Sequence, residues 1–316
     1  MPVVEVTDYR PSLFLRNGHY NTIFTSLFRK VEIPAYQRTR LNTPDGDFLD
    51  VDCLHGDHKK ACILLHGLEG SSDSQYMKSA GNMMAANGWD VYAVNWRGCS
   101  GEPNLKITSY HSGFTDDLAF ILETYAHKYS EVQIIGYSLG ANVLLKYLGE
   151  DPAAVPSNIS KSFAISTPCH LSDGAKELKK KSNWLYTQNF LKTLKQKMIE
   201  KEKQFPGLVD LSKLNMVVDV WEFDEYYTGP MNGFAGAEDY YSQSMSLQFL
   251  PMIDRETHII TAIDDPFLAE SSSPFAEAKK SKYVHFHPST YGGHVGFYRQ
   301  NNETWIDEML LSLSQR

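Results

Sequence analysis

Ser138 stands in a Gly-x-Ser-x-Gly run over residues 136–140, directly after the apolar stretch 132–135. A serine on a tight turn between a strand and a helix has strained backbone angles, and the two flanking glycines leave room for that turn. Residues 141–148 continue with apolar positions at helical spacing. The pattern therefore predicts a nucleophile elbow in which Ser138 is the nucleophile.

Two further polar residues follow later strand patterns. Asp265 comes after the apolar run 257–263, and His294 lies between glycines in the loop after the strand pattern 282–287. The order serine, acid, histidine is the order of α/β-hydrolase topology, in which all three lie at the carboxyl ends of parallel strands. A histidine can take the hydroxyl proton, and a carboxylate fixes the tautomer of the imidazole. We predict that Ser138 is the nucleophile, His294 the base and Asp265 the orienting acid.

The acid has a neighbouring alternative, Asp264. Asp265 is favoured because Ala262-x-x-Asp265 matches the small-x-x-Asp pattern in which this fold places its acid, so Asp264 is expected to hydrogen-bond the loop. The other polar residues that invite a chemical interpretation are expected to be structural: His19, Arg97, His111, His258, His285 and His287.

A His-Gly loop, residues 66–72, follows the buried strand pattern 62–65. In this kind of fold the residue after His-Gly supplies an oxyanion amide, here Leu68, and the amide of Leu139 at the start of the next helix supplies the second. Each amide could stabilise the tetrahedral intermediate by about 2.7–4 kcal/mol. The loop lacks the Gly-Lys-Ser/Thr ending of a phosphate-binding loop, so that interpretation is disfavoured.

Apolar runs and helical patterns alternate along much of the chain. The strand patterns cover 48–54, 62–65, 90–95, 132–135, 161–166, 257–263 and 282–287, and the helical patterns cover 74–87, 116–128, 141–148 and 303–313. The first strand alternates apolar and acidic residues, as a half-exposed strand does. The alternation predicts an α/β-hydrolase fold, with a mostly parallel central sheet flanked by helices.

The alternation stops between residues 171 and 245, where a lysine-rich helical stretch precedes an aromatic loop. We expect a helical lid at 171–245 inserted into a core of 1–170 and 246–316, with 1–35 as a helical extension packing on the core. The aromatic residues either line an acyl pocket or form the lid's own small core. The lysines leave open a weak contact with a membrane surface, although interspersed glutamates favour a solvated helix face.

Composition excludes several other classes of protein. The chain of 316 residues has a net charge of -8, which argues against a nucleic-acid surface. Its four cysteines show no C-x-x-C spacing, which is typical of unpaired thiols in a reducing compartment. No signal-peptide core, no apolar run of ~20 residues and no metal-ligand spacing occurs. We therefore expect a cytoplasmic enzyme with a small-molecule substrate and no cofactor, metal or nucleic-acid partner; no oligomeric state is predicted.

Several long motifs follow one another in a specific order. They are Asn17-Gly18-His19, His66-Gly67-Leu68-Glu69-Gly70, Asn95-x-Arg97-Gly98-Cys99-Ser100-Gly101-Glu102, Tyr110-His111-Ser112-Gly113, Gly136-Tyr137-Ser138-Leu139-Gly140-Ala141-Asn142, Asp264-Asp265-Pro266-Phe267 and Gly292-Gly293-His294-x-Gly296-Phe297. With these motifs the chain resembles the YheT-like (AB hydrolase 4) branch of the α/β-hydrolases, which includes bacterial esterases and eukaryotic acylglycerol or phospholipid lipases.

The resemblance implies a carboxylic ester hydrolase acting on short- or medium-chain acyl esters, with the triad on Ser138, Asp265 and His294. One departure is Phe114, where the family usually has an acidic residue, and it concerns the polar network of that loop. Acyl transfer to an alcohol uses the same triad and is the nearest alternative function. A non-catalytic binding protein on this fold would typically lack a triad member, and all three are present here.

Overall fold

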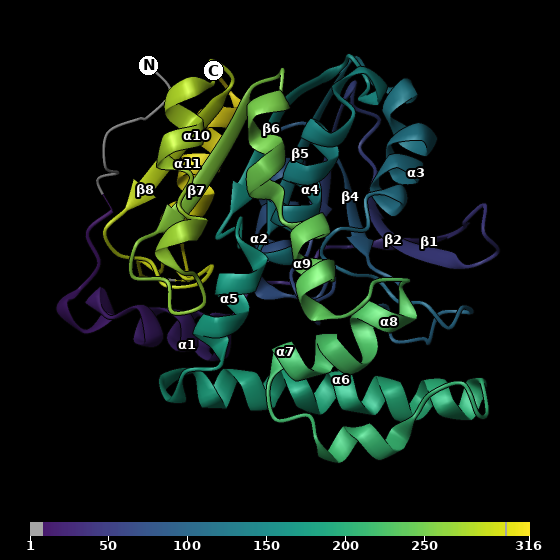
Figure 1. Ribbon diagram of the computed structural model, residues 1–316. Coiled ribbons are helices and arrows are strands. Elements are labelled where there is room, and N and C mark those ends of the chain that lie inside the picture. The colour runs from purple at the N-terminus through teal and green to yellow at the C-terminus, as the bar shows by residue number, and fades with distance from the viewer. Residues whose placement is uncertain (1–8, 301) are drawn as a thin grey trace.

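An eight-stranded sheet runs through the centre of the computed structural model, which describes residues 9–300 and 302–316 (Figure 1). The strands are β1 (Gln37–Asn42), β2 (Phe48–Leu54), β3 (Lys60–Leu65), β4 (Asp90–Asn95), β5 (Glu131–Tyr137), β6 (Ile159–Ile165), β7 (Thr257–Ala262) and β8 (Val284–Ser289). Their spatial order is β1-β2-β4-β3-β5-β6-β7-β8. The pairs β1–β2 and β2–β4 are antiparallel and the others are parallel, which confirms the predicted fold class.

Helices cover both faces of this sheet. One face packs against α2 (Gln75–Ala86) and α11 (Trp305–Ser314), and the other against α3 (Asp116–Tyr125), α4 (Leu139–Glu150) and α10 (Phe275–Lys280). The central strands are buried on both sides because alternate residues enter different cores. On β4, for example, Val91 and Ala93 contribute to the first core and Tyr92 and Val94 to the second.

Strand β2 is not half-exposed, so that expectation was wrong. Its acidic residues, Asp50 and Asp52, are buried although they alternate with apolar residues. Arginines of the edge strand β1 cover them: Arg40 forms two hydrogen bonds of 2.8 Å to Asp50, and Arg38 does the same to Asp52. Each carboxylate therefore meets a bidentate guanidinium in place of water.

The chain between β6 and β7 lies outside the sheet and forms a layer of helices below it in Figure 1. Its α-helices are α5 (Leu171–Leu178), α6 (Trp184–Gln204), α7 (Val220–Phe223), α8 (Gly229–Met231) and α9 (Ala237–Ser244), with a π-helical turn at Asp224–Thr228. We call residues 171–245 the inserted segment. A short 3-10 helix, Ser246–Met252, leads back to the sheet.

Near the N-terminus, a 3-10 turn (Leu13–Arg16) precedes α1 (Gly18–Phe28). Figure 1 shows α1 beside the beginning of α6, and a contact of 3.3 Å between His19 Nδ1 and the hydroxyl of Tyr186 joins the two helices. Within the described residues, no helix combines the length and the apolar character needed to cross a membrane.

Candidate active site

Ser138 lies on the turn between β5 and α4, with φ 52° and ψ -117°. A residue with a side chain rarely adopts a positive φ, so the turn has to be held by its surroundings. Gly140 allows this close packing, because a Cβ there would lie 2.6 Å from the carbonyl oxygen of His66. The predicted elbow therefore forms between β5 and the first turn of α4.

The three residues predicted for the triad meet at the carboxyl edge of the sheet. His294 Nε2 lies 2.9 Å from Ser138 Oγ, and His294 Nδ1 lies 2.8 Å from Asp265 Oδ2. The Asp265 side chain is fully buried, and its other oxygen accepts a hydrogen bond of 2.9 Å from the amide of Phe267. The Phe267 ring packs on the imidazole with centroids 4.3 Å apart. This is the geometry in which a histidine can accept a serine proton.

Asp264 takes a different position from Asp265. Its Oδ1 accepts a hydrogen bond of 2.9 Å from the amide of Gly293, which directly precedes the histidine. Burial, with a further contribution from the charge of Asp265, raises the pKa of Asp264 to about 6. Of the two adjacent acids, Asp265 is therefore the one in contact with the imidazole, and Asp264 supports the loop.

Helix α1 holds the backbone of the histidine loop, a contact that the sequence reasoning missed. The hydroxyl of Thr22 accepts a hydrogen bond of 2.8 Å from the amide of His294 and donates one of 2.7 Å to the carbonyl of Gly18. A Cβ at Gly18 would lie 1.8 Å from the Asp264 carbonyl oxygen. The backbone of α1 therefore packs so closely on the loop at Asp264 that no side chain fits at position 18. The motif Asn17-Gly18-His19 was the available signal, because a glycine inside a helix indicates a close backbone approach.

The loop predicted to supply an oxyanion amide lies against Ser138. A Cβ at Gly67 would lie 3.0 Å from Ser138 Cβ, so the backbone leading to Leu68 passes next to the serine. His66 holds this loop: its Nε2 accepts from the amide of Trp96 at 3.1 Å, and its Nδ1 therefore carries the proton and donates to the Gly67 carbonyl at 2.7 Å. Burial lowers the pKa of His66 to about 3, so the ring is neutral. Leu139 is the first residue of α4, where backbone amides point out of the helix.

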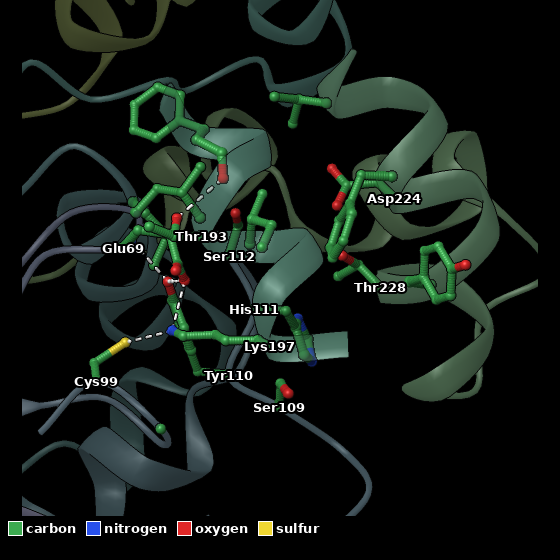
Figure 2. Close-up of a pocket in the computed structure, with 18 of the residues that line it drawn as sticks. Glu69, Cys99, Ser109, Tyr110, His111, Ser112, Thr193, Lys197, Asp224 and Thr228 are labelled. Atoms are coloured by element: carbon green, nitrogen blue, oxygen red, sulfur yellow. Dashed lines mark hydrogen bonds and ion pairs between the residues drawn. The ribbon is translucent and has the colours of Figure 1, made fainter. Parts of the chain in front are cut away.

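An ion pair joins the His-Gly loop, residues 66–72, to the inserted segment. Lys197 of α6 lies 2.7 Å from Glu69 Oε1 and 3.3 Å from Cys99 Sγ, as Figure 2 shows. The hydroxyl of Tyr110 donates to the same Glu69 oxygen at 2.8 Å and accepts from the Glu69 amide at 2.8 Å. Burial acts to lower the pKa of Lys197, but the adjacent Cys99 and Glu69 outweigh it and the pKa is raised. The lysine is therefore charged, next to the residue that follows Leu68.

A cavity of about 610 Å³ lies between the sheet edge and the inserted segment. Ser138 and His294 line it, and the inserted segment contributes apolar and aromatic side chains. Phe223 and Tyr227 face this cavity and also belong to an apolar cluster within the segment. These two aromatic residues therefore line the cavity and also take part in the segment's own apolar core.

Asp224 lies on the far wall of the cavity from Lys197, as Figure 2 shows. Its carboxylate accepts a hydrogen bond of 2.6 Å from the hydroxyl of Tyr241. Burial raises the pKa of Asp224 to about 6, so this acid is ionised at neutral pH and takes up its proton at a higher pH than an ordinary aspartate does. Within residues 9–300 and 302–316, no group of three or more His, Cys, Asp or Glu side chains is arranged to hold a metal ion.

Arg97 and His111 have the contacts of a scaffold. Arg97 pairs with Asp117 at 2.7 Å and Asp45 at 2.6 Å, and its guanidinium lies 5.0 Å from the ring centroid of Phe114. The arginine is thus fully paired although residue 114 is not acidic. Nδ1 of His111 accepts from the amide of Gly113 at 3.2 Å. All four cysteines are free, as expected from their spacing.

Comparison with known proteins extends these observations. YheT of Escherichia coli (strain K12), which is provisionally named an esterase, is 32% identical over 299 residues, covering 92% of this chain and 87% of YheT. Human phospholipase ABHD3 is 25% identical over 99% of this chain and 80% of its own length. The monoacylglycerol lipase of Saccharomyces cerevisiae is 26% identical over 85% of this chain and 61% of its own length. These relatives support a hydrolase activity.

Solved structures give the same fold. The esterase Pf2001 of Pyrococcus furiosus superposes with a TM-score of 0.59 at 18% identity, covering 89% of this chain and 90% of the esterase. The sequence profile of the alpha/beta hydrolase fold family matches residues 60–298, from the strand before the His-Gly loop to beyond His294. The chain therefore belongs to the α/β-hydrolase family, in its YheT-like branch.

Proposed function

We propose that this chain is a serine hydrolase that cleaves carboxylic esters of short to medium acyl chain length through an acyl-Ser138 intermediate. The observation that carries the proposal is the continuous path from Ser138 Oγ to His294 Nε2 at 2.9 Å and from His294 Nδ1 to Asp265 Oδ2 at 2.8 Å. A hydroxyl is a weak nucleophile until a base removes its proton, and this path provides the base and fixes its tautomer.

In the first half-reaction, Ser138 Oγ bonds to the carbonyl carbon of the ester while its proton moves to His294 Nε2. The resulting oxyanion accepts hydrogen bonds from the amides of Leu68 and Leu139. The bond from carbon to the alcohol oxygen then breaks, and that oxygen takes the proton from Nε2. The products of this step are the free alcohol and the acyl ester of Ser138.

In the second half-reaction, water takes the place of the alcohol. His294 Nε2 removes a proton from water as the water oxygen bonds to the acyl carbon. The carbon–Oγ bond then breaks, Ser138 recovers its proton from the imidazole, and the carboxylic acid leaves. Asp265 stabilises the imidazolium in both halves because its buried carboxylate contacts Nδ1 directly.

The cavity supports an acyl ester as substrate. Its volume of about 610 Å³ lies in the usual range for small-molecule sites, and aromatic and aliphatic side chains contribute much of its wall. Relatives named esterase, phospholipase and monoacylglycerol lipase are consistent with ester cleavage at this site. We further propose that the inserted segment acts as a lid over Ser138.

The test is a series of p-nitrophenyl esters from acetate to palmitate, measured on the wild type and on Ser138→Ala. We expect turnover at short to medium acyl lengths and a loss of kcat on the order of 10⁴-fold or more in the variant. Ser138→Ala that retained most of the turnover would overturn the proposal. Added ethanol distinguishes the alternative: alkyl ester in excess over free acid would identify an acyltransferase.

A further inference from the structure

Helix α1 buries its polar face and exposes apolar side chains, the reverse of an ordinary surface helix. Its buried residues are polar or small and include Asn21, Thr22 and Thr25, whereas Leu27 and Phe28 are exposed. Globular proteins usually bury the apolar face of such a helix and expose the polar one. Here the polar face of α1 is buried, because Thr22 and Asn21 accept hydrogen bonds from backbone amides of the loop that contains His294. The apolar face is left facing outward.

The exposed apolar side chains continue onto neighbouring elements. We define the apolar surface as Leu13, Phe14, Tyr20, Leu27, Phe28, Ile33, Trp184 and Leu185, each of which is more than half exposed. The rings of Phe14 and Tyr20 stack with centroids 4.8 Å apart. The contact of His19 with Tyr186 brings the start of α6, with Trp184 and Leu185, next to α1 (Figure 1). An apolar group of this size on one side of a protein indicates a contact surface.

The charges around this surface are positive although the chain as a whole is acidic. Residues 9–31 contain four Arg or Lys and no Asp or Glu, in a chain whose net charge is -8. Arg29 is paired with Asp307 at 2.6 Å, whereas Arg16 and Lys30 are exposed. Lys181, which precedes Trp184, is also exposed, and among the described residues the exposed acids Glu32 and Glu303 lie close to the end of α1. The surface therefore combines aromatic and aliphatic side chains with a cationic border.

We propose that the apolar surface docks on a lipid layer with anionic headgroups. Phe, Leu and Trp side chains enter the boundary between headgroups and acyl chains, while lysine and arginine pair with the headgroups. A second copy of this chain fits less well, because a two-fold contact through the same surface would bring the two cationic borders together. The exposed apolar face of α1, and not the lysine-rich face of α6, is the main element of this contact.

The apolar surface is connected to the candidate active site by direct contacts. Tyr186, next to the surface residue Leu185, packs edge-on against Phe267 with centroids 4.7 Å apart, and Phe267 packs on His294. If the chain is the ester hydrolase proposed above, its substrate is an acyl ester presented by a lipid layer.

The experiment measures vesicle binding in the Ser138→Ala background, so that it needs no turnover. Flotation with vesicles of equimolar phosphatidylcholine and phosphatidylglycerol is compared for the parent, for Leu27→Glu and for the matched control Leu208→Glu. Leu27 and Leu208 are 68% and 67% exposed, but Leu208 lies beyond the opposite end of α6. We expect Leu27→Glu to lower the partition coefficient onto the vesicles about tenfold or more, because one buried leucine contributes about that factor. Leu208→Glu should bind like the parent.

Further arms separate the remaining explanations. Binding should weaken as salt rises and on pure phosphatidylcholine vesicles, because the cationic border loses its partner. Turnover of a short soluble p-nitrophenyl ester by Leu27→Glu with Ser138 intact should equal that of the wild type. The proposal is overturned if the parent does not float, if both Glu variants bind equally, or if sedimentation velocity shows a dimer that only Leu27→Glu dissociates.

Discussion

Lys197→Met tests the connection between the inserted segment and the His-Gly loop, whose Leu68 amide is proposed to bind the oxyanion. In the wild type, the Lys197 ammonium lies 2.7 Å from a Glu69 carboxylate that is 6% exposed. Methionine keeps most of the packing of the lysine stem but leaves that carboxylate with Tyr110 as its remaining close polar partner. The variant therefore creates an unpaired, nearly buried negative charge next to Leu68.

The magnitude follows from the burial of the two partners. Breaking a buried ion pair by removing one partner costs about 3–5 kcal/mol, and the 26% exposure of the Lys197 side chain favours the lower end. In a chain of this length, about 3 kcal/mol corresponds to a fall in Tm of about 4 °C. Removal of a whole oxyanion donor costs about 10²–10³ in kcat, so a displaced Leu68 amide should cost about 10- to 100-fold.

The assay combines thermal unfolding with kcat and KM for p-nitrophenyl butyrate. Lys203→Met, on the exposed side of the same helix, is the control and should leave both readouts unchanged. The double variant Lys197→Met/Glu69→Gln should recover most of the lost stability, because the glutamine carries no charge. Wild-type Tm and kcat in Lys197→Met would refute the reasoning, and so would an equal loss in Lys203→Met.

The remaining predictions concern single acids of the site. Asp265→Asn should lower kcat about 10⁴-fold, because the carboxylate no longer fixes the tautomer of the imidazole. Asp264→Asn should lower kcat less than about tenfold, because its amide oxygen can still accept the hydrogen bond from Gly293. Equal losses of kcat on p-nitrophenyl butyrate would contradict the assignment of the acid. Asp224 binds its proton more tightly in the folded than in the unfolded chain, because burial raises its pKa to about 6. Its charge therefore destabilises the fold above pH 6, and this penalty disappears as the pH falls towards 3.8, the usual pKa of an aspartate. Asp224→Asn should raise stability at pH 8 by about 3 kcal/mol, or about 4 °C in Tm, and should have little effect near pH 4, so a pH-independent change in Tm would disprove the explanation.

The sheet and the site were predictable because both depend on local patterns. Buried strands are visible as apolar runs, and a glycine-flanked serine, an Asp-Asp pair and a glycine-flanked histidine each lie in the turn or loop after such a run. Topology then brings Ser138, Asp265 and His294 to one edge of the sheet without further information from the chain. The choice between Asp264 and Asp265 followed from spacing alone.

What the sequence did not predict depends on contacts between distant segments. The hydroxyl of Thr22 meets the His294 backbone across 272 positions of the chain, and Lys197 meets Glu69 across 128. The burial of Asp52 depends on Arg38 of the neighbouring strand, and strand periodicity cannot show that a charged face is covered. For α1, helical spacing defines an apolar face but does not decide whether that face turns inward.

The most direct test of the central claim is to identify the residue that becomes covalently modified by an ester-like electrophile. Wild-type protein is reacted with a fluorophosphonate, and intact-mass measurement and peptide mapping locate the adduct. We expect a single adduct on Ser138, none on Ser138→Ala, and a rate at least about 10³-fold lower for His294→Ala, which removes the base. An adduct at another residue, or labelling of Ser138 that is as fast without His294, would contradict the proposed mechanism.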